Sequence, residues 1–327
     1  MSQTVLVLGA SGFIGGHIAR AALAHGWTVR GLRRSAAVGH LTEPEIEWYT
    51  GDLADPDSLV AAMQGCEVVF HAAAYYPSPR RPRPMAEHLA TGAQEIQNVL
   101  AACRQAGVSR LVYTSSLTTI DQPPPSDDRL ADERDTYQPE NPPASAYHEV
   151  KILMENAVLA ANGPQLEIVV TNPTAVFGPG DVHLTLSPIL IAAARGLVIG
   201  WLPVSINIID VRDVAVAHIA AAGVGRPGQR YILGGHNLPV KTAFTTVAKI
   251  AGVRPPFLPI PFLLIDLFVF IGRLLPFLHL PVNHIAKLRR WQGYNTERAE
   301  RELGLTARRL EQTITDALAW LRENGHL

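Results

Sequence analysis

The feature that most constrains this chain is a glycine-rich segment close to its N-terminus. The apolar, β-branched run Thr4–Leu8 leads directly into Gly9–Gly15, whose glycines have a GxxGxxG spacing. A strand, a tight turn and a helix in this order let backbone N–H groups approach a pyrophosphate closely. A purely structural turn is the alternative. The residues expected around the phosphates are Gly9, Ser11, Gly12, Phe13, Ile14 and Gly15.

The first half of the chain alternates short β-branched runs with longer alanine-rich stretches. This alternation predicts an α/β fold with a Rossmann-type, doubly wound parallel sheet and helices on both faces. The expected strands are Thr4–Leu8, Thr28–Leu32, Val68–His71, Leu111–Ser115 and Glu167–Thr171. The expected helices are Gly15–Ala24, Met85–Ala106 and Tyr147–Ala161.

The second half is less regular and predicts a smaller, substrate-binding C-terminal lobe. We expect residues 1–174 to form the dinucleotide-binding domain, with a segment of about 205–235 returning to it. In that segment, a strand Asn207–Asp210 and a helix Val211–Ala222 are expected to rejoin the main sheet. Residues 175–204 and 236–327 would then make the smaller lobe. The proline-rich stretch Asp121–Pro143 is expected to be a surface loop near the substrate entrance.

Charge and cysteine usage exclude several classes of protein. The formal net charge is −1, which offers no basic field for a nucleic-acid partner. The two cysteines, Cys66 and Cys103, lie far apart and form no CxxC pattern. We therefore expect no disulfide framework and no metal site, and a cytoplasmic location.

Residues 257–280 are strongly apolar, but Asp266, Arg273 and three prolines interrupt them. A clean spanning helix needs about 18–20 apolar residues, so no stable membrane insertion is expected. The segment predicts a pocket or subunit-contact helix, with a membrane-surface contact as the alternative.

Two arginines end the second expected strand, where NAD-type sites usually carry a carboxylate for the adenosine ribose. The strand reads TVRGLRRS, which places Arg33 and Arg34 at that end. Guanidinium groups suit a 2′-phosphate through forked, charge-assisted hydrogen bonds. The pair therefore favours NADP(H), with NAD(H) possible. A solvated surface pair is the alternative interpretation.

A tyrosine and a lysine, Tyr147 and Lys151, stand four residues apart on an expected helix and so share one face. An ordinary tyrosine has a pKa of about 10, and a nearby ammonium favours its phenolate. Thr114, Ser115 and Ser116 end the strand before that helix, at the sheet edge where ligands bind. Together these residues predict acid–base chemistry on a substrate oxygen.

In this order and spacing, the motifs resemble the extended short-chain dehydrogenase/reductase family, or NAD-dependent epimerase/dehydratase superfamily. Besides those above, the motifs are Gly51-Asp52-Leu53, His71-Ala72-Ala73-Ala74, Asn172-Pro173-Thr174, Gly178-Pro179-Gly180-Asp181 and Tyr294–Leu305. The resemblance covers nearly the whole chain. It is greatest to the dihydroflavonol-reductase-like branch, which includes hopanoid-associated sugar epimerase-like and 3β-hydroxysteroid dehydrogenase-like proteins.

The resemblance implies a role for each motif. Ser116, Tyr147 and Lys151 would be catalytic. The cofactor would also contact Asp52 and Leu53 at the adenine, His71, Ala72 and Ala73 along its centre, Thr114 and Ser115 at the strand end, and Asn172, Pro173 and Thr174 at the nicotinamide. One segment departs from the family pattern: Leu89–Ala93 lacks an asparagine that often helps to order the active site.

Three functions are compatible with these residues. The leading hypothesis is an oxidoreductase in which hydride passes between the nicotinamide and a carbonyl carbon while Tyr147 transfers the proton and Ser116 polarises the oxygen. The second is a sugar-nucleotide epimerase or dehydratase that returns the hydride internally. The third is a catalytically inactive dinucleotide-sensing protein. The apolar 257–280 segment favours a hydrophobic substrate, and helices 85–106 and 147–161 resemble those that pair family members into homodimers.

Overall fold

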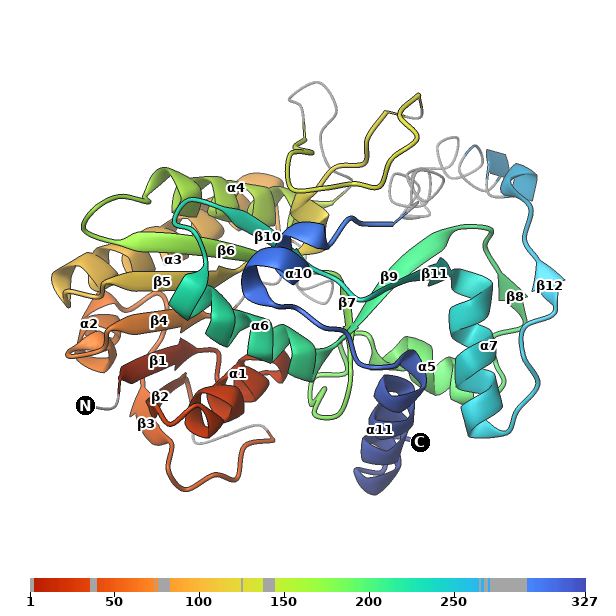
Figure 1. Cartoon of the computed structure of the whole chain (residues 1–327), viewed down its shortest axis with the longest axis horizontal. Helices are drawn as coiled ribbons and strands as arrows, with labels where there is room; N and C mark the ends of the chain where they lie inside the picture. The colour runs from red at the N-terminus through yellow and green to blue at the C-terminus, as the bar shows by residue number, and fades with distance from the viewer. Residues whose placement is uncertain are drawn as a thin grey trace.

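Seven parallel strands form the central sheet of the larger lobe, in the order β10-β6-β5-β4-β1-β2-β3 (Figure 1). The computed structural model describes residues 3–35, 40–73, 75, 83–124, 126–137, 145–264, 266–267, 270 and 293–327. The strands are β1 Thr4–Leu8, β2 Thr28–Arg33, β3 Glu47–Thr50, β4 Val68–His71, β5 Arg110–Thr114, β6 Glu167–Pro173 and β10 Arg230–Leu233. In the inner strands β1, β4, β5 and β6, most β-branched and aromatic side chains are buried on both faces, as a parallel sheet covered by helices requires.

Helices cover both faces of this sheet and enclose two separate cores. In Figure 1, α1 (Phe13–Ala24) and α6 (Val211–Val224) lie below the strands. On the other face lie α2 (Pro56–Met63), α3 (Met85–Gln105) and α4 (Ala146–Ala160). The Rossmann-type fold class predicted from the sequence is confirmed. The expected strands and helices of this region are present, with ends shifted by at most two residues, and β3 is an additional strand.

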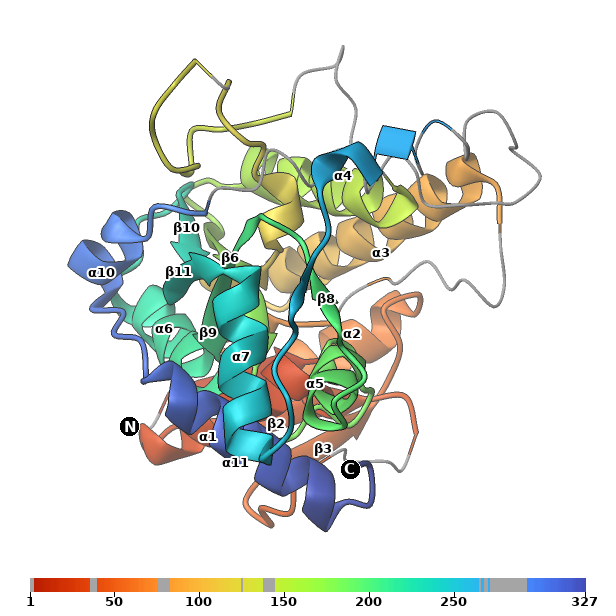
Figure 2. The same cartoon turned by 90° about the vertical axis from the view of Figure 1, so that its right-hand side faces the viewer.

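A three-stranded sheet, in the order β11-β9-β7, forms the base of the smaller lobe (Figure 2). Its apolar core lies between that sheet and three helices. The strands are β7 Ala175–Phe177, β9 Ser205–Asp210 and β11 His236–Pro239, and the helices are α5 Ser187–Ala194, α7 Val240–Ala251 and α11 Leu310–Glu323. The remaining elements are the 3-10 turn η1 Leu117–Thr119, the paired short strands β8 Gly200–Trp201 and β12 Leu258–Pro259, and α10 Glu297–Leu303.

The expectation that Asn207–Asp210 rejoins the main sheet is wrong. That segment is part of β9, which pairs with β7 and β11, whereas β10 pairs with β6 in the main sheet. The expected helix is correct, because α6 packs against α1 on the main sheet. The unit β9–α6–β10 is thus a crossover that starts in one sheet and ends in the other. A strand–helix pattern shows the crossover but not which of its two short strands joins the large sheet.

Two sequence expectations fall partly outside the described residues. Residues 265, 268–269 and 271–292 are among those not described, so the helix expected within 257–280 cannot be compared with the structure. Within the part of the chain that is described, no helix is long and apolar enough to cross a membrane. The described part of the proline-rich stretch, residues 121–124 and 126–137, contains no helix and only the isolated bridge Ala131–Tyr294.

A glycine sets the spacing of α3 and α4. Gly92 lies in the Leu89–Ala93 segment, and a Cβ atom placed there would be 2.7 Å from Val150 Cγ1 on α4. Gly223 also lies inside a helix, but a Cβ there would meet no atom within 4 Å.

We expect Gly92→Ala to lower the free energy of unfolding by about 1–3 kcal/mol, because one helix must move. The matched control Gly223→Ala gains helix propensity without a clash and should be neutral or stabilising by up to about 1 kcal/mol. Chemical denaturation of both variants measures this difference. Equal stability of the two variants would contradict the close packing of α3 on α4.

Candidate active site

A cavity of about 960 Å³ lies where the two lobes meet, over the carboxyl ends of the central strands. Its lining includes Gly9 after β1, Ala72 after β4, Thr114 at the end of β5 and Pro173 at the end of β6. Because β1 lies between β4 and β2, the strand order reverses here. Open α/β sheets bind their ligands at this kind of switch point.

Most residues that the sequence predicted for the site line this one cavity. They are Gly9, Ser11, Gly12, Phe13, Ile14, Arg33, Arg34, Asp52, Leu53, Ala72, Ala73, Thr114, Ser115, Ser116, Tyr147, Lys151, Pro173 and Thr174. Three predicted residues do not line it: Gly15, His71 and Asn172.

The glycine turn leaves backbone room that a dinucleotide would use. Gly9 has a φ of +84°, and a Cβ there would lie 2.7 Å from the backbone nitrogen of Ala73. The following helix, α1, starts after Gly12 with no side-chain cap. Its first turn can therefore donate N–H groups to an anion, which fits the pyrophosphate of a nicotinamide dinucleotide.

Gly15 does not line the cavity, but it allows the close helix packing expected of the third glycine in the motif. A Cβ at this position would collide with the backbone of Gly9 and Ala10, so the missing side chain lets α1 pack onto the turn. His71 is fully buried at the end of β4, beneath the cavity floor, with its ring edge-on to Tyr113 at 5.3 Å between centroids. Burial, followed by the charge of Lys151, lowers the pKa of His71 to about 3, so this imidazole is neutral.

Asn172 is also fully buried and lies behind the cavity wall rather than in it. Successive side chains of a strand point to opposite faces, so Pro173 reaches the cavity and Asn172 does not. The Asn172 amide instead donates to Glu155 and Thr119. The sequence motif contains both residues, but only the local face of β6 decides which of the two side chains lines the cavity.

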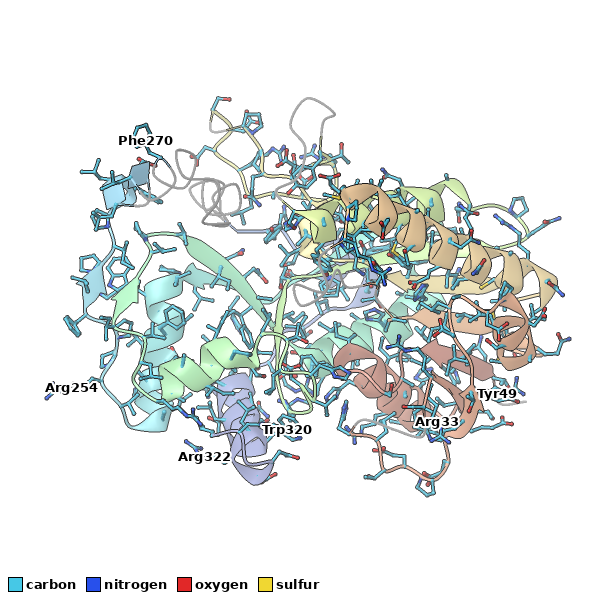
Figure 3. All side chains as sticks on the ribbon, turned by 180° about the vertical axis from the view of Figure 1, so that it is seen from behind. Arg33, Tyr49, Arg254, Phe270, Trp320 and Arg322 are labelled. Carbon is cyan, nitrogen blue, oxygen red and sulfur yellow. The ribbon has the colours of Figure 1, made fainter. Side chains whose placement is uncertain are left out.

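Charged residues of both signs line the cavity near the end of β2, where the sequence predicts the adenosine. Arg33 and Arg34 extend from the end of β2, and the Arg33 guanidinium lies 5.2 Å from the centre of the Trp48 ring. Figure 3 shows Arg33 in the larger lobe, at the opposite end of the molecule from Arg254. Two carboxylates, Asp52 after β3 and Glu95 on α3, also line the cavity.

Glu95 was not identified from the sequence, since nothing marks it within a long amphipathic helix. Burial and then the charge of Asp52 raise its pKa, while Arg34 opposes them.

The three expected catalytic residues come from two neighbouring elements. Ser116 follows β5 and caps η1, and its Oγ accepts a hydrogen bond from the Thr118 backbone N–H at 3.2 Å. Tyr147 and Lys151 lie one turn apart on α4. All three line the cavity, and Lys151 Nζ donates to the Thr114 carbonyl at 3.3 Å.

Lys151 is an ammonium group held in a nearly dry place, with 2% of its surface exposed. Burial lowers its pKa to about 8, and the nearby Glu155 carboxylate acts in the opposite direction. Its Nζ also lies 5.6 Å from the centre of the Tyr113 ring. A lysine whose pKa is lowered in this way can lose its proton close to physiological pH.

The smaller lobe contributes a mainly apolar wall. The side chains that it presents to the cavity include Phe177, Leu186, Ile189, Leu190, Ile206, Ile208, Val240, Phe244, Val247 and Ile314. Its polar contributions are His183, Thr185, Ser205, Asn207 and Tyr294. Among the described lining residues, this lobe provides no lysine, arginine or carboxylate.

Two histidines of the smaller lobe differ in their relation to the cavity. His183 lines the cavity, whereas His236 contacts the Arg308 carbonyl at 2.7 Å, away from it. Asn207 accepts hydrogen bonds from Thr174 Oγ1 and the Gly235 N–H, which ties the wall of the smaller lobe to the end of β6.

The cavity combines a glycine turn that suits a dinucleotide, the predicted acid–base side chains and a wall from the second lobe. Together these features define a class of enzyme. Enzymes of this class bind NAD(P) on a Rossmann-type sheet and act on a small molecule held by the second lobe. Residues 5–234 match the model of the NAD dependent epimerase/dehydratase family, and the chain belongs to that family. It is an NAD(P)-dependent oxidoreductase of the extended short-chain dehydrogenase/reductase branch.

Known proteins that resemble the chain over its whole length carry several activities. A Synechocystis sp. protein with the provisional name dihydroflavonol 4-reductase is 31% identical, over 100% of this chain and 97% of its own. Sterol demethylase protein B of Methylococcus capsulatus is 28% identical, over 99% of each chain. The crystal structure of a nucleoside-diphosphate-sugar epimerase from Pseudomonas aeruginosa is 25% identical, covers 100% of both chains and superposes with a TM-score of 0.84.

The buried ammonium of Lys151 should cost stability, and Lys151→Met tests this. Below about pH 8 the lysine is charged in both the folded and the unfolded chain, so folding carries the full cost of its burial. Between about pH 8 and the ordinary lysine pKa near 10.4, the unfolded chain binds more protons, so stability rises with pH. We expect Lys151→Met to unfold with a free energy higher by about 1–3 kcal/mol at pH 7 and to lose this rise.

The exposed Lys249 on α7 supplies the control, since Lys249→Met should change stability by no more than about 0.5 kcal/mol. Denaturant unfolding at a series of pH values measures both variants. A Lys151→Met protein that is less stable than wild type at pH 7 would contradict the interpretation of this lysine as a strained charge.

Proposed function

We propose that this chain is an NADP(H)-dependent oxidoreductase that interconverts a carbonyl and an alcohol on a hydrophobic small molecule, with Tyr147 as the general acid and base. The observation that carries the proposal is the composition of one cavity. Tyr147, Lys151 and Ser116 line it between the glycine turn and the uncharged wall of the smaller lobe.

The side chains divide the chemistry among them. The nicotinamide, when bound, supplies or takes up the hydride. Tyr147 donates its phenolic proton to the substrate oxygen in the reductive direction and takes it back in the oxidative one. Ser116 donates a hydrogen bond to the same oxygen and polarises it. The charge of Lys151 favours the phenolate of Tyr147, because a nearby cation stabilises an anion in a site of low dielectric constant.

The wall of the smaller lobe supports a hydrophobic substrate. Phe244, Leu190 and Ile206 are typical of its surface, and burying apolar surface of a ligand against them yields about 25 cal/mol per Å². The similarity to a protein named for sterol demethylation supports the same class of substrate.

A sugar-nucleotide epimerase is the second candidate, favoured by the match to the Pseudomonas aeruginosa structure. Such a substrate carries a diphosphate, which proteins usually bind with arginine, lysine or helix N-termini. The described lining of the smaller lobe offers no arginine or lysine for it.

We also propose that the chain forms a homodimer through α3 and α4. The two helices lie side by side on one face of the main sheet. The sequence resemblance implies that this pair of helices forms the two-fold interface of a homodimer.

The proposed mechanism predicts that Tyr147→Phe loses most turnover while it still binds the cofactor. We expect kcat to fall by about 10²–10⁴-fold, as for loss of a general acid, with the Kd for NADPH within about twofold of wild type. NADPH oxidation is followed by absorbance against a panel of hydrophobic ketones and aldehydes. Turnover of a nucleotide sugar without net NADPH consumption would instead establish the epimerase. An active Tyr147→Phe variant would exclude this tyrosine as the acid.

The proposed preference for NADP(H) depends on the arginines after β2. Arg34→Ser should weaken NADPH binding by about 10- to 100-fold, the value of one charge-assisted hydrogen bond, and leave NADH binding little changed. The same substitution at Arg30, Arg30→Ser, is the control. The Arg30 guanidinium is bonded to Glu47, and this residue does not line the cavity. Fluorescence titration of both dinucleotides measures the ratio. An equal loss of NADH and NADPH binding would contradict recognition of the 2′-phosphate.

A further inference from the structure

A buried carboxylate, Glu155, lies directly behind the proposed catalytic residues. It is four residues after Lys151 on α4, one turn farther along the same face, and only 2% of its surface is exposed. A charge taken out of water is costly unless it is paired and hydrogen-bonded. The groups that surround Glu155 therefore indicate the role of this buried carboxylate.

Three elements of the fold meet at this one carboxylate. Oε2 accepts hydrogen bonds from Thr119 Oγ1 of η1 and from Asn172 Nδ2 of β6, both at 2.7 Å. Oε1 lies 3.2 Å from Nε of Arg230, which is on β10 and almost completely buried. Glu155 thus joins α4 to the turn after β5 and to two strands of the main sheet.

The same contacts reach the backbone of Ser116. The Thr119 hydroxyl lies 2.9 Å from the Ser116 carbonyl and shares its single proton between that oxygen and Glu155. Asn172 Nδ2 lies 2.8 Å from Thr119 Oγ1 and 3.3 Å from the Ser116 carbonyl. The carbonyl of Ser116 is therefore connected to α4, the helix that carries Tyr147 and Lys151, through two short polar bridges.

We propose that Glu155 is a positioning residue: it holds the Ser116 turn against α4 so that Ser116 Oγ and the Tyr147 phenol meet the same substrate oxygen. The role rests on the proposed function of those two residues. It also gives a role to Asn172, which does not line the cavity: its amide donates hydrogen bonds to Glu155 and Thr119.

The carboxylate has a second effect, through its charge. Lys151 faces Tyr147 and Glu155 on its own helix, the Tyr113 ring on β5 and the neutral His71 on β4, while Arg230 of β10 pairs with Glu155. Of these groups, Glu155 raises the pKa of Lys151 against the lowering by burial. Without its charge, Lys151 would lose its proton at a lower pH.

Two nearly isosteric variants separate geometry from charge. Glu155→Gln removes the charge and one acceptor, whereas Thr119→Val removes the bridging hydroxyl and keeps the carboxylate. The matched control is Glu167→Gln, which breaks the Arg110–Glu167 pair between β5 and β6, since none of the contacts of that pair involves Ser116 or Lys151. Reductase kinetics as a function of pH, with Tyr147→Phe alongside, are measured together with thermal unfolding and NADPH binding.

We expect Glu155→Gln to lower kcat by about 10-fold or more, as misplacement of a reacting group does, with the Kd for NADPH within about twofold of wild type. The alkaline limb of its rate profile should move to lower pH by about half a unit or more. Thr119→Val should lower kcat without moving that limb, and Glu167→Gln should change neither. If kcat and the pH profile of both Glu155→Gln and Thr119→Val match wild type, the proposal is wrong. A lower Tm with unchanged kcat per folded molecule would mean that Glu155 is merely structural.

Crystal structures of wild type and of both variants provide a test that does not depend on turnover. In the variants, the Ser116 turn should be displaced relative to Tyr147, while the sheet stays in place. A wild-type enzyme that reduces no compound of the panel would count against the proposed function alone. An unmoved Ser116 in both variants would count against the positioning role alone. Should Glu155→Gln fail to fold, Thr119→Val, which leaves the Glu155–Arg230 pair intact, still decides the geometric part.

Discussion

The close approach of the Gly9 backbone to the end of β4 is the contact on which the rest of the site depends. Because Gly9 has no side chain, the turn after β1 can lie against Ala73, and α1 can start directly above the sheet edge. The parallel register of β1 with β4, and of β4 with β5, then brings the ends of three strands to one level. The cradle for the phosphates and the Ser116 turn therefore share one cavity floor.

Buried charge is the second constraint on the site. Burying charged side chains lowers the stability of the fold, and here they lie beside the proposed catalytic residues. Lys151 and Glu155 are both almost completely buried on α4, and Arg230 joins them from β10. Ion pairs in such surroundings add little net stability, because desolvation offsets their attraction. Their effect is to limit the geometry. The contacts of Glu155 connect α4 to the Ser116 turn and to β10, and the proposed catalysis by Tyr147 and Ser116 would require such a fixed arrangement.

The sequence predicts the larger lobe well because its signals are local. The strands and helices before residue 175 follow from β-branched runs, alanine-rich stretches and one glycine motif, each read within a short window. The failures arise where partners are distant in sequence. The place of β9 depends on pairing with β7 and β11, and Glu95 of α3 lines the same cavity as Arg34, 61 residues before it. Neither relation leaves a pattern along the chain.

The sequence alone determined the class of fold, the family and the residues of three motifs that line the cavity, namely the glycine turn, the YxxxK pair and the strand-end hydroxyls, since each motif is contained within a few residues of the chain. The tertiary structure decided which face each residue presents. His71 and Asn172 stand in the expected motifs yet do not line the cavity, and the Asn172 amide instead donates a hydrogen bond to Glu155, 17 residues before it. The physical reason is that side chains on a strand alternate between faces, so a motif can place a residue at the site without deciding which way it points.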